Sequence, residues 1–583
     1  MHDDVTGREQ HYDVVVVGSG FGGSVAALRL TEKGYRVAVL EAGRRFEDED
    51  FARTSWDLRR FLWAPRLGCY GIQRIHRVSD SLVLAGAGVG GGSLVYANTL
   101  YRPLPDFYRD PQWAHVTDWE AELAPWYDQA ERMLGATPNP SVTASDVLFR
   151  TVARRMDVEG TVAPARVGVV FGARPGERVP DPYFGGAGPE RTACTECGAC
   201  MTGCRVGAKN TLVKNYLHLA ERAGAVVVPM TTVTGLRREG ASWVLDARST
   251  AGRRRSVWRA DQVVLAAGTY GTQTLLHRAR DRGDLRPSAR LGTATRTNSE
   301  ALVGASAPRV DPERPLARGV AITSSFYPDP RTHVEPVRYA PGSNAMSLLQ
   351  TALTTGGPRS TRGLRILGRL AAELLRAPVR TVRARVPYRW SERTAIALVM
   401  QALDNSIVVS SRRGLTGRRL VSRQGPGEPS PTWIPAADRA ARLLAEELGG
   451  VPGSSWGDAL NMPLTAHFIG GCPVGLGPED GVLDPYLRVH GHPSLHVVDG
   501  AAVSANLGVN PSLTITAMAE RAMSFWPVHG EPDQRPTDQS RYERLDAVPP
   551  ARPAVPDDAP AALRGPRAAR GTRPSPRAPS ARP

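Results

Sequence analysis

The segment YDVVVVGSGFGGSVAALRLTEKGYRVAVLEAG, residues 12–43, decides the fold class of this chain. Residues 12–17 form a short, valine-rich run, which is typical of a strand buried in a parallel sheet. Residues 22–33 have helical periodicity, and Gly34 follows as a residue that can end a helix in a left-handed conformation. Residues 36–40 form a second apolar run. The segment therefore predicts a β-α-β unit within an α/β domain.

The turn between the first strand and the helix has the G-x-G-x-x-G spacing of a dinucleotide-binding site. Gly18 permits the tight turn, Gly20 lets the backbone approach a pyrophosphate, and Gly23 lets the helix pack closely on the strand. The free N–H groups at the start of the helix favour the anion. Glu41 is placed to accept hydrogen bonds from a ribose hydroxyl, which favours FAD or NAD over NADP. The other residues of the predicted turn are Ser19, Phe21 and Gly22.

A second glycine-rich segment, GAGVGGGSLVYAN, covers residues 86–98. A backbone without side-chain bulk can lie against a phosphate or a flat ring, although such a segment is also compatible with a mobile surface loop. Two long glycine-rich contacts suit a large, extended cofactor and therefore favour FAD. The predicted cofactor-binding residues here are Gly88, Gly91, Gly92, Ser93 and Asn98.

Four cysteines lie within CTECGACMTGC, residues 194–204. Their C-x₂-C-x₂-C-x₃-C spacing is that of ferredoxin iron–sulfur ligands, except that Arg205 replaces the usual proline. Structural zinc more often takes two separated C-x₂-C pairs, and thiols without a metal are the third interpretation. The candidate metal ligands are Cys194, Cys197, Cys200 and Cys204.

The composition limits the class of protein. A chain of 583 residues predicts roughly two to four domains. No stretch approaches the ~18 apolar residues of a transmembrane helix, and residues 14–17 are too short for a signal-peptide core, so we expect a cytoplasmic protein. The net charge of +16 arises without the interleaved aromatic residues of a nucleic-acid site, so no nucleic-acid partner is expected. Residues 531–583, rich in Pro, Ala and Arg, are expected to be a disordered or loosely draped tail.

The C-terminal third contains TAHFIGGCPVG (residues 465–475) and LHVVDGAAVSANLGVNPSLTITAMAERA (residues 495–522). With the two glycine segments and VVLAAGTYGTQTLL (residues 263–276), these motifs resemble the glucose–methanol–choline (GMC) flavoprotein oxidoreductases over about residues 12–526. Within that family the chain is most similar to the actinobacterial cholesterol oxidase branch.

The resemblance implies roles for the C-terminal motifs. His467, which opens H-x-x-G-G-C, faces the flavin and handles the proton of the substrate hydroxyl, and Asn510 is the second active-site residue. Asp499 and Gly500 correspond to a turn that contacts the flavin or its ribityl chain. Asn510 and Pro511 are also predicted to contact the cofactor.

Two further positions follow from the resemblance. Val233 corresponds to a segment whose backbone holds the adenine end of FAD. Tyr96 occupies the place where steroid oxidases carry an asparagine near the ring, and Asn98 lies close to that place in the sequence.

The residue types suit the chemistry of alcohol oxidation. Removal of a hydride from carbon requires that a proton leave the hydroxyl oxygen, and neutral imidazole is a suitable base near neutral pH. The amide of Asn510 can hold the substrate oxygen. His490, His492 and His496 are expected to be structural.

The predicted fold is α/β, with an FAD-binding Rossmann-like (GMC) domain and a second, α+β substrate domain built on an antiparallel sheet. The FAD-binding domain is expected to comprise residues 10–105, 190–300 and 455–527, and the substrate domain residues 106–189 and 301–454. Residues 391–414 are expected to form antiparallel strands. Steroid-oxidising relatives also use a glutamate from this region to shift a ring double bond, and Glu335 and Glu392 are candidates that no motif distinguishes.

Residues 362–386 form an amphipathic, arginine-rich segment. As a helix, Arg365, Arg369 and Arg376 share one face, and Pro378 is expected to end or kink it. Such a helix can rest on an anionic membrane, although an ordinary surface helix has the same pattern. The opposite face carries Leu364, Leu367, Leu370, Ala371 and Leu374.

The resemblance implies FAD-dependent oxidation of the 3β-hydroxyl of cholesterol or a related sterol, with O₂ or an external electron acceptor. One alternative is a GMC dehydrogenase for another hydrophobic or long-chain alcohol that passes electrons through an iron–sulfur cluster. A flavin-bearing electron carrier without alcohol turnover is the third interpretation.

Overall fold

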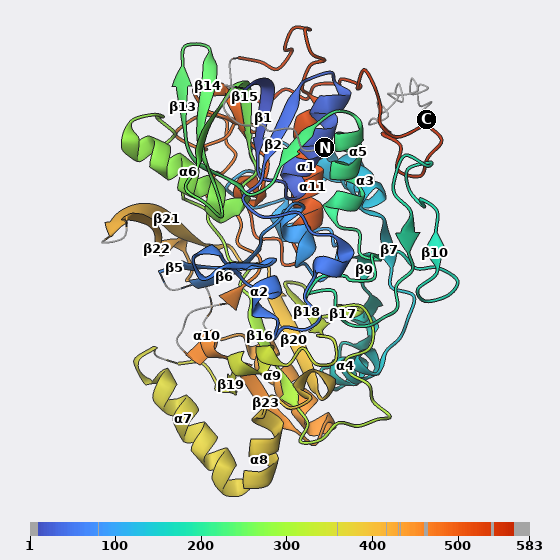
Figure 1. The fold of residues 1–583 in the computed structure, drawn as a ribbon. Coiled ribbons are helices and arrows are strands. Elements are labelled where there is room, and N and C mark those ends of the chain that lie inside the picture. The colour runs from blue at the N-terminus through green and yellow to red at the C-terminus, as the bar shows by residue number, and fades with distance from the viewer. Residues whose placement is uncertain are drawn as a thin grey trace, which may run out of the picture.

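The computed structural model describes residues 10–79, 81–357, 359–414, 417–429, 431, 433–459, 464–537 and 541–564. Figure 1 shows two sheets at opposite ends of an elongated molecule, with helices between and around them. Among the described helices, none is long and apolar enough to cross a membrane.

The first sheet contains the predicted β-α-β unit. Strand β1 (Gln10–Val17) pairs in parallel with β2 (Val37–Leu40) and with β15 (Arg255–Leu265), and α1 (Phe21–Glu32) connects β1 to β2. The strand order is β12–β2–β1–β15–β14–β13, and β26 joins beside β15. Side chains 14–17 are almost completely buried, which explains the run of valines. The remaining strands are β12 (Val226–Val228), β13 (Thr231–Glu239), β14 (Ser242–Ser249), β25 (Arg488–Val489) and β26 (His492–Val497).

Helices α1, α3 (Trp119–Leu134), α5 (Tyr216–Arg222) and α11 (Ser512–Ser524) pack together on this sheet and share its core, to which Leu275 and Leu276 also contribute. Helix α3 differs from the expectation, because its segment was assigned to the substrate domain. Trp113, Trp119 and Trp126 are buried in the core of the first sheet. The physical reason is that these large aromatic side chains bury their apolar area against α11, far along the chain.

The second sheet is antiparallel throughout, in the order β19–β23–β16–β20–β18–β17–β8. One face packs on α4 (Ala144–Arg155) and α9 (Pro435–Glu447), and the other faces the large cavity described below. Alternation along β20 (Thr394–Gln401) shows the two faces: Ala397 lies in the helix-covered core, and Ile396 and Leu398 line the cavity. The other strands are β8 (Ala163–Pro164), β16 (Ala301–Ser306), β17 (Ser324–Asp329), β18 (Thr332–Val337), β19 (Gln350–Ala352) and β23 (Val451–Ser455).

Smaller elements connect the two sheets. Strands β5 (Gln73–Val78), β6 (Ser81–Gly86) and β24 (Leu464–Thr465) form a three-stranded sheet that lies between them in Figure 1. Strand β21 (Asn405–Gly414) pairs with β22 (Gly417–Gly427), and α6 (Gly268–Arg282) follows β15. As expected, residues 391–414 thus form antiparallel strands, although β20 and β21 belong to different sheets. The remaining short elements are α2 (Leu58–Phe61), β3 (Trp63–Ala64), β4 (Cys69–Tyr70), β7 (Ala136–Pro138), β9 (Arg166–Gly168), β10 (Arg178–Val179), β11 (Arg191–Thr192) and α10 (Trp456–Ala459).

Helices α7 (Arg359–Arg376) and α8 (Pro378–Arg385) form an arm that projects at the lower left of Figure 1. Pro378 is the first residue of α8, so the proline separates two helices as predicted. Ile366 and the partly buried Leu370 pack against Ala352, which attaches α7 to the second sheet.

The described part of the C-terminal tail follows the expectation of a draped chain and not that of a disordered one. Residues 541–564 run over the first domain without helix or strand, and Val555, Ala559 and Ala561 enter its core. The backbone N–H of Ala561 donates to the carbonyl of Tyr183. Small alanine side chains fill gaps that the helices leave, which a count of large apolar residues does not detect. Residues 565–583 lie outside the described part of the chain.

Candidate functional site: a large cavity with a buried histidine

The first glycine turn has the conformation that a pyrophosphate site requires. Gly18 has a φ of +101°, and a Cβ atom there would lie 2.3 Å from the carbonyl oxygen of Ala266. Gly20 precedes α1 without a side-chain cap, so the first N–H groups of the helix keep their hydrogen-bonding capacity. A Cβ atom at Gly20 would meet no protein atom within 4 Å, because this position faces an open cavity.

The second glycine segment lies directly against the first. A Cβ atom at Gly91 would lie 2.7 Å from the Cα atom of Gly20. The Ser19 hydroxyl accepts from the N–H of Gly90 at 3.1 Å and donates to Glu41 Oε2 at 2.7 Å. Two segments about seventy residues apart thus form one continuous cradle that fits an extended dinucleotide.

The cradle opens into a cavity of about 600 Å³. Most residues predicted to bind the cofactor or to be catalytic line this cavity, whether they lie in the glycine segments, on β13 or in the C-terminal motifs. They are Gly18, Ser19, Gly20, Phe21, Gly22, Glu41, Gly91, Gly92, Val233, His467, Asp499, Gly500, Asn510 and Pro511.

Four predicted residues lie behind the cavity wall, where they support it. Gly23 packs against the carbonyl of Gly18, as expected for close helix–strand contact. Gly88 has a φ of +127°, and its backbone packs closely against residues 43–46. The Ser93 hydroxyl donates to the carbonyl of Gly90 at 2.7 Å. Asn98 is completely buried, and its amide lies beside the thiol of Cys200, whose pKa it influences.

His467 and Asn510 come together at the cavity. His467 follows β24, which pairs with β6, and Asn510 precedes α11. The Asn510 Nδ2 atom lies 3.4 Å from His467 Nε2 and donates to Glu335 Oε2, also at 3.4 Å. Both side chains are buried, at 8% and 6% exposure. An imidazole and an amide therefore present their polar atoms at one point of an otherwise largely apolar cavity.

Two carboxyl groups accompany this pair: Glu335, one of the two candidate glutamates of the sequence, and Glu300, which the sequence analysis did not name. Glu335 on β18 is completely buried, and burial, offset in part by the Asn510 hydrogen bond, raises its pKa to about 8. Glu300, just before β16, has its Oε2 atom 3.2 Å from His467 Nδ1. The other candidate glutamate, Glu392, forms an ion pair with Arg389 instead. Only the structure shows that strand β18 is buried along its whole length, and a carboxyl group buried there is what distinguishes Glu335 from Glu392.

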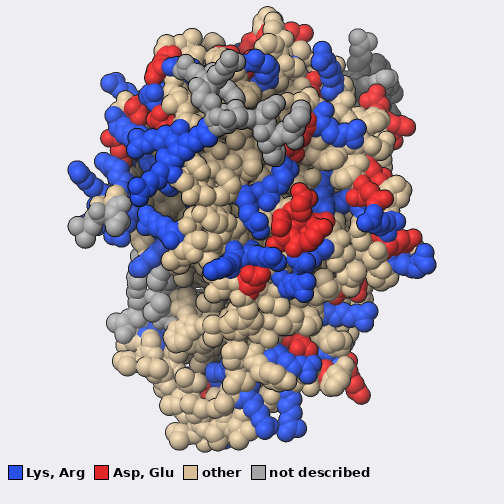
Figure 2. All heavy atoms as spheres, viewed as in Figure 1, with Lys and Arg blue, Asp and Glu red and all other residues tan. Residues whose placement is uncertain are grey.

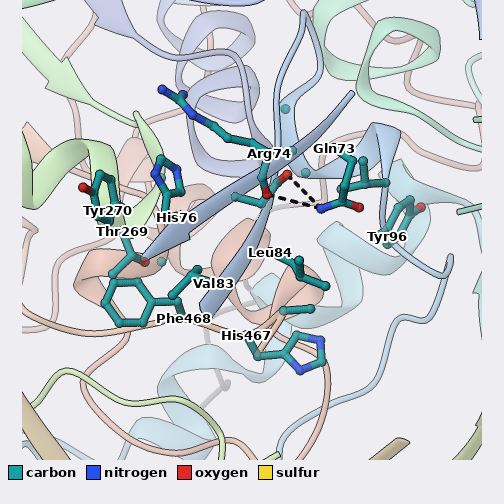
Figure 3. A pocket seen from close by; sticks show the side chains of 18 of the residues that line it. Gln73, Arg74, His76, Val83, Leu84, Tyr96, Thr269, Tyr270, His467 and Phe468 are labelled. Carbon is teal, nitrogen blue, oxygen red and sulfur yellow. Dashed lines mark hydrogen bonds between the residues drawn. The ribbon is translucent and has the colours of Figure 1, made fainter. Parts of the chain in front are cut away.

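The wall above His467 contains further polar groups that the sequence analysis did not name. Figure 3 shows Arg74 and His76 of β5 on one side of the cavity, with Tyr270 beside His76. The rings of His76 and Tyr270 stack at 3.8 Å. Burial, with the nearby Arg74 charge, keeps the pKa of His76 well below its usual value. His76 therefore presents a neutral imidazole, and Arg74 places a positive charge in the same cavity.

The four cysteines line a second, small cavity together with Lys209. Burial raises the pKa of Cys194 above its usual range and that of Cys200 to about 11, so both hold their protons at neutral pH. Within the described residues, no group of three or more His, Cys, Asp or Glu side chains is arranged to hold a metal ion. The arrangement gives no support to the metal prediction for Cys194, Cys197, Cys200 and Cys204.

Comparison with protein families defines the class of this protein. Residues 13–394 match FAD dependent oxidoreductases, and residues 435–519 match the C-terminal domain of the GMC oxidoreductases. The chain belongs to the GMC family of FAD-dependent oxidoreductases, and it is an FAD-dependent alcohol oxidoreductase.

Individual relatives refine this assignment. A cholesterol oxidase of Mycobacterium tuberculosis (strain H37Rv) is 59% identical over 564 residues, which cover 95% of this chain and 97% of that protein. A cholesterol oxidase of Acinetobacter baumannii is 40% identical, with 92% and 98% covered.

Solved structures share the fold. Pyridoxine 4-oxidase from Mesorbium loti has a TM-score of 0.56 at 18% identity, covering 88% of this chain and 98% of that chain. A formate oxidase from Aspergillus oryzae has a TM-score of 0.55 at 15% identity, covering 89% and 98%. At such identities the likeness concerns the fold alone, a Rossmann-like FAD-binding domain with a sheet-based second domain.

Proposed function

We propose that this protein oxidises the 3β-hydroxyl of cholesterol or a related sterol to the 3-ketone, with His467 and Asn510 at the reacting hydroxyl. The observation that carries the proposal is the meeting of these two side chains at the cavity that both glycine segments line. The 59% identity to a cholesterol oxidase supports the choice of a sterol.

The roles of the two residues follow from their atoms. The Asn510 amide can donate to the hydroxyl oxygen of the substrate and hold it beside the imidazole. His467 takes the hydroxyl proton at Nε2, which increases alkoxide character and weakens the C–H bond at the carbinol carbon. FAD, when bound, supplies the acceptor for the hydride.

The cavity wall opposite the cradle suits an apolar substrate. It comes from the inner face of the second sheet and from the segment before β19. An apolar wall with few convergent polar groups is what a rigid hydrocarbon with one hydroxyl requires. The apolar lining residues include Leu302, Val337, Tyr339, Met346, Leu349, Trp390, Ile396 and Leu398.

Anaerobic reduction of the flavin by a panel of alcohols tests the substrate class. We expect sterols with a 3β-hydroxyl to bleach the flavin at micromolar concentration, and 3α-epimers and linear long-chain alcohols to do so at least about tenfold more slowly. A matched 3-ketosteroid is the control for binding without chemistry. Equal rates for sterols and linear alcohols would contradict the sterol assignment, and no reduction by any alcohol would indicate an electron carrier.

The electron acceptor in this proposal is O₂. One observation bears on the dehydrogenase alternative, in which electrons leave through the cysteines. Cys200 lines the cysteine cavity, and Met201, the next residue in the sequence, lines the flavin cavity. Iron and acid-labile sulfide analysis of the purified protein, combined with O₂ uptake during sterol turnover, separates the two. Stoichiometric iron with slow O₂ uptake would favour the dehydrogenase.

We also propose that the α7–α8 arm docks the protein on an anionic lipid surface, from which the sterol enters. Leu370 packs against the second sheet, but much of the apolar face of the arm is open: Leu364, Leu367 and Leu375 are 72%, 61% and 87% exposed. The lower end of the molecule in Figure 2, over this arm, is mostly uncharged, with basic side chains beside it. Leu349, which lines the cavity, is itself 41% exposed near the start of β19, against which α7 packs.

Replacing Leu367 and Leu375 together by Asp should weaken binding to vesicles of anionic phospholipid and sterol by at least about tenfold, because burial of each leucine contributes about 1.5–3 kcal/mol. Co-sedimentation measures binding, and turnover of detergent-dispersed sterol should stay within about twofold of wild type. The matched control is Leu67→Asp, an exposed leucine outside the arm. Unchanged vesicle binding by the double variant would exclude the arm as the docking element.

A further inference from the structure

Glu300 lies on the Nδ1 side of the His467 ring, and Asn510 lies on the Nε2 side. We propose that Glu300 is a positioning residue, which holds His467 in one orientation and one tautomer. The inference rests on the proposed function, because it concerns the imidazole that takes the substrate proton.

Glu300 is bound to the same short segment that carries His467. Its carboxyl accepts from the Thr465 hydroxyl and from the backbone N–H groups of Ala466 at 3.1 Å and His467 at 3.2 Å. Its side chain is only 1% exposed. These contacts fix the carboxylate to the backbone of residues 465–467, so that its position follows the backbone of the histidine.

The remaining contact reaches the ring itself. Glu300 Oε2 lies 3.2 Å from His467 Nδ1, and within the described residues Nδ1 is buried and forms no hydrogen bond of good geometry with any group. The two atoms are within hydrogen-bonding distance, but their angle is not that of a formed hydrogen bond. Such geometry is common for catalytic groups before the substrate binds. The Glu300 carboxylate, which already accepts from several donors, can only act as an acceptor toward the His467 ring. The neutral tautomer that suits this contact therefore carries its proton on Nδ1.

The opposite side of the ring agrees with this tautomer. An amide N–H of Asn510 faces His467 Nε2 at 3.4 Å, and an N–H donor needs an unprotonated nitrogen as acceptor. Nδ1–H toward Glu300 and a free lone pair at Nε2 toward the cavity satisfy both neighbours. This is the state in which Nε2 can take the proton of a substrate hydroxyl.

The two buried carboxyl groups therefore differ in function. Glu335 contacts Asn510 and not the imidazole, whereas Glu300 contacts the imidazole and its backbone. Glu300 lines the same cavity, but the His467 ring stands between its nearer oxygen and Asn510, where the substrate hydroxyl is proposed to bind. Its effect on the reaction passes through the orientation and protonation of His467.

Glu300→Gln tests the inference in stopped-flow flavin reduction by sterol. The glutamine amide can donate to Nδ1 and so stabilise the wrong tautomer, and we expect the limiting rate to fall by about 10–10²-fold. The sterol concentration at half-maximal rate, the FAD content and the thermal midpoint should stay close to wild type. Glu392→Gln, a change of a glutamate that binds Arg389, is the matched control and should leave the rate unchanged.

A double-mutant cycle separates positioning from a merely structural role. If Glu300 acts through the imidazole, Glu300→Gln should cause no further loss in a His467→Ala background. If Glu300→Gln does not bind FAD, Glu300→Asp, which keeps the charge but withdraws the oxygen from Nδ1, takes its place in the same cycle. Full additivity, or an unchanged rate in both variants, would overturn the inference. A wild-type rate in His467→Ala alone would instead overturn the proposed function.

Discussion

His467→Ala should slow anaerobic flavin reduction by sterol ~10²–10⁴-fold, because the variant has no base to take the hydroxyl proton as the hydride leaves. The methyl side chain leaves a small polar gap, and water in that gap is a poor substitute for a positioned imidazole. The binding of FAD should persist, since the two glycine segments and Glu41 form the cradle without His467. Stopped-flow absorbance of the flavin measures the rate directly.

His492→Ala is the matched control for this variant. His492 lies on β26, where its ring packs at the edge of Trp243, and it does not line the flavin cavity. The rate of flavin reduction by the His492→Ala variant should remain within about twofold of wild type. A His467→Ala enzyme that reduces flavin within tenfold of wild type would show that another group accepts the proton.

Glu335→Gln should abolish the double-bond shift and largely spare the oxidation. We propose that the protein also shifts the ring double bond of its 3-keto product, and that Glu335 removes a proton from the ring carbon beside the new ketone and returns it at the far end of the double bond. Glutamine has nearly the same shape and can still contact Asn510, but it cannot take a proton. Isomerisation should fall ~10²–10⁴-fold, as expected for loss of a general base. Ultraviolet absorbance of the conjugated enone and chromatography of the unshifted ketone measure the two steps separately.

The same residue predicts how isomerisation depends on pH. The pKa of Glu335 is raised to about 8 by burial, so the carboxyl holds its proton below that pH and becomes a base above it. The rate should therefore increase with pH up to about 8 and then level off. Neighbouring groups should not add a second transition, because burial lowers the pKa of His333 to about 3 and raises that of Tyr101 well above its usual value. Glu300 also faces this carboxyl and raises its pKa slightly through charge.

Two results would contradict this assignment. An isomerisation rate that falls as the pH rises from 6 to 8 would have the wrong sign for a carboxylate base. Equal losses of oxidation and isomerisation in Glu335→Gln would indicate a structural role for the buried carboxyl.

The cofactor cradle could be predicted from the sequence because its parts are local. The turn at Gly18, the helix start at Gly20 and the close packing at Gly23 each depend on a few neighbouring residues. His467 and Asn510 were predicted from local motifs as well. The contact between the two glycine segments, with Gly91 against Gly20, depends on the packing of distant parts of the chain. It became visible only in the structure.

The carboxyl groups of the site could not be predicted in the same way. Glu335 contacts Asn510 across 175 residues of sequence, and Glu300 contacts His467 across 167 residues. Nothing near Glu335 or Glu392 in the sequence distinguishes a buried base from a surface ion pair. The antiparallel register of β18 and β20 pairs Glu335 with Leu398, which lines the cavity, whereas Glu392 lies before β20.

The sequence by itself determined the α/β class, the dinucleotide turn and the two faces of the helix at residues 359–376, because each depends on spacing within one segment. Only the tertiary structure decided which face of that helix is open, which glutamate joins the active site and how the four cysteines are arranged. The physical reason is that burial and pairing are properties of surfaces brought together from distant parts of the chain, so their energies depend on contacts that local spacing does not contain.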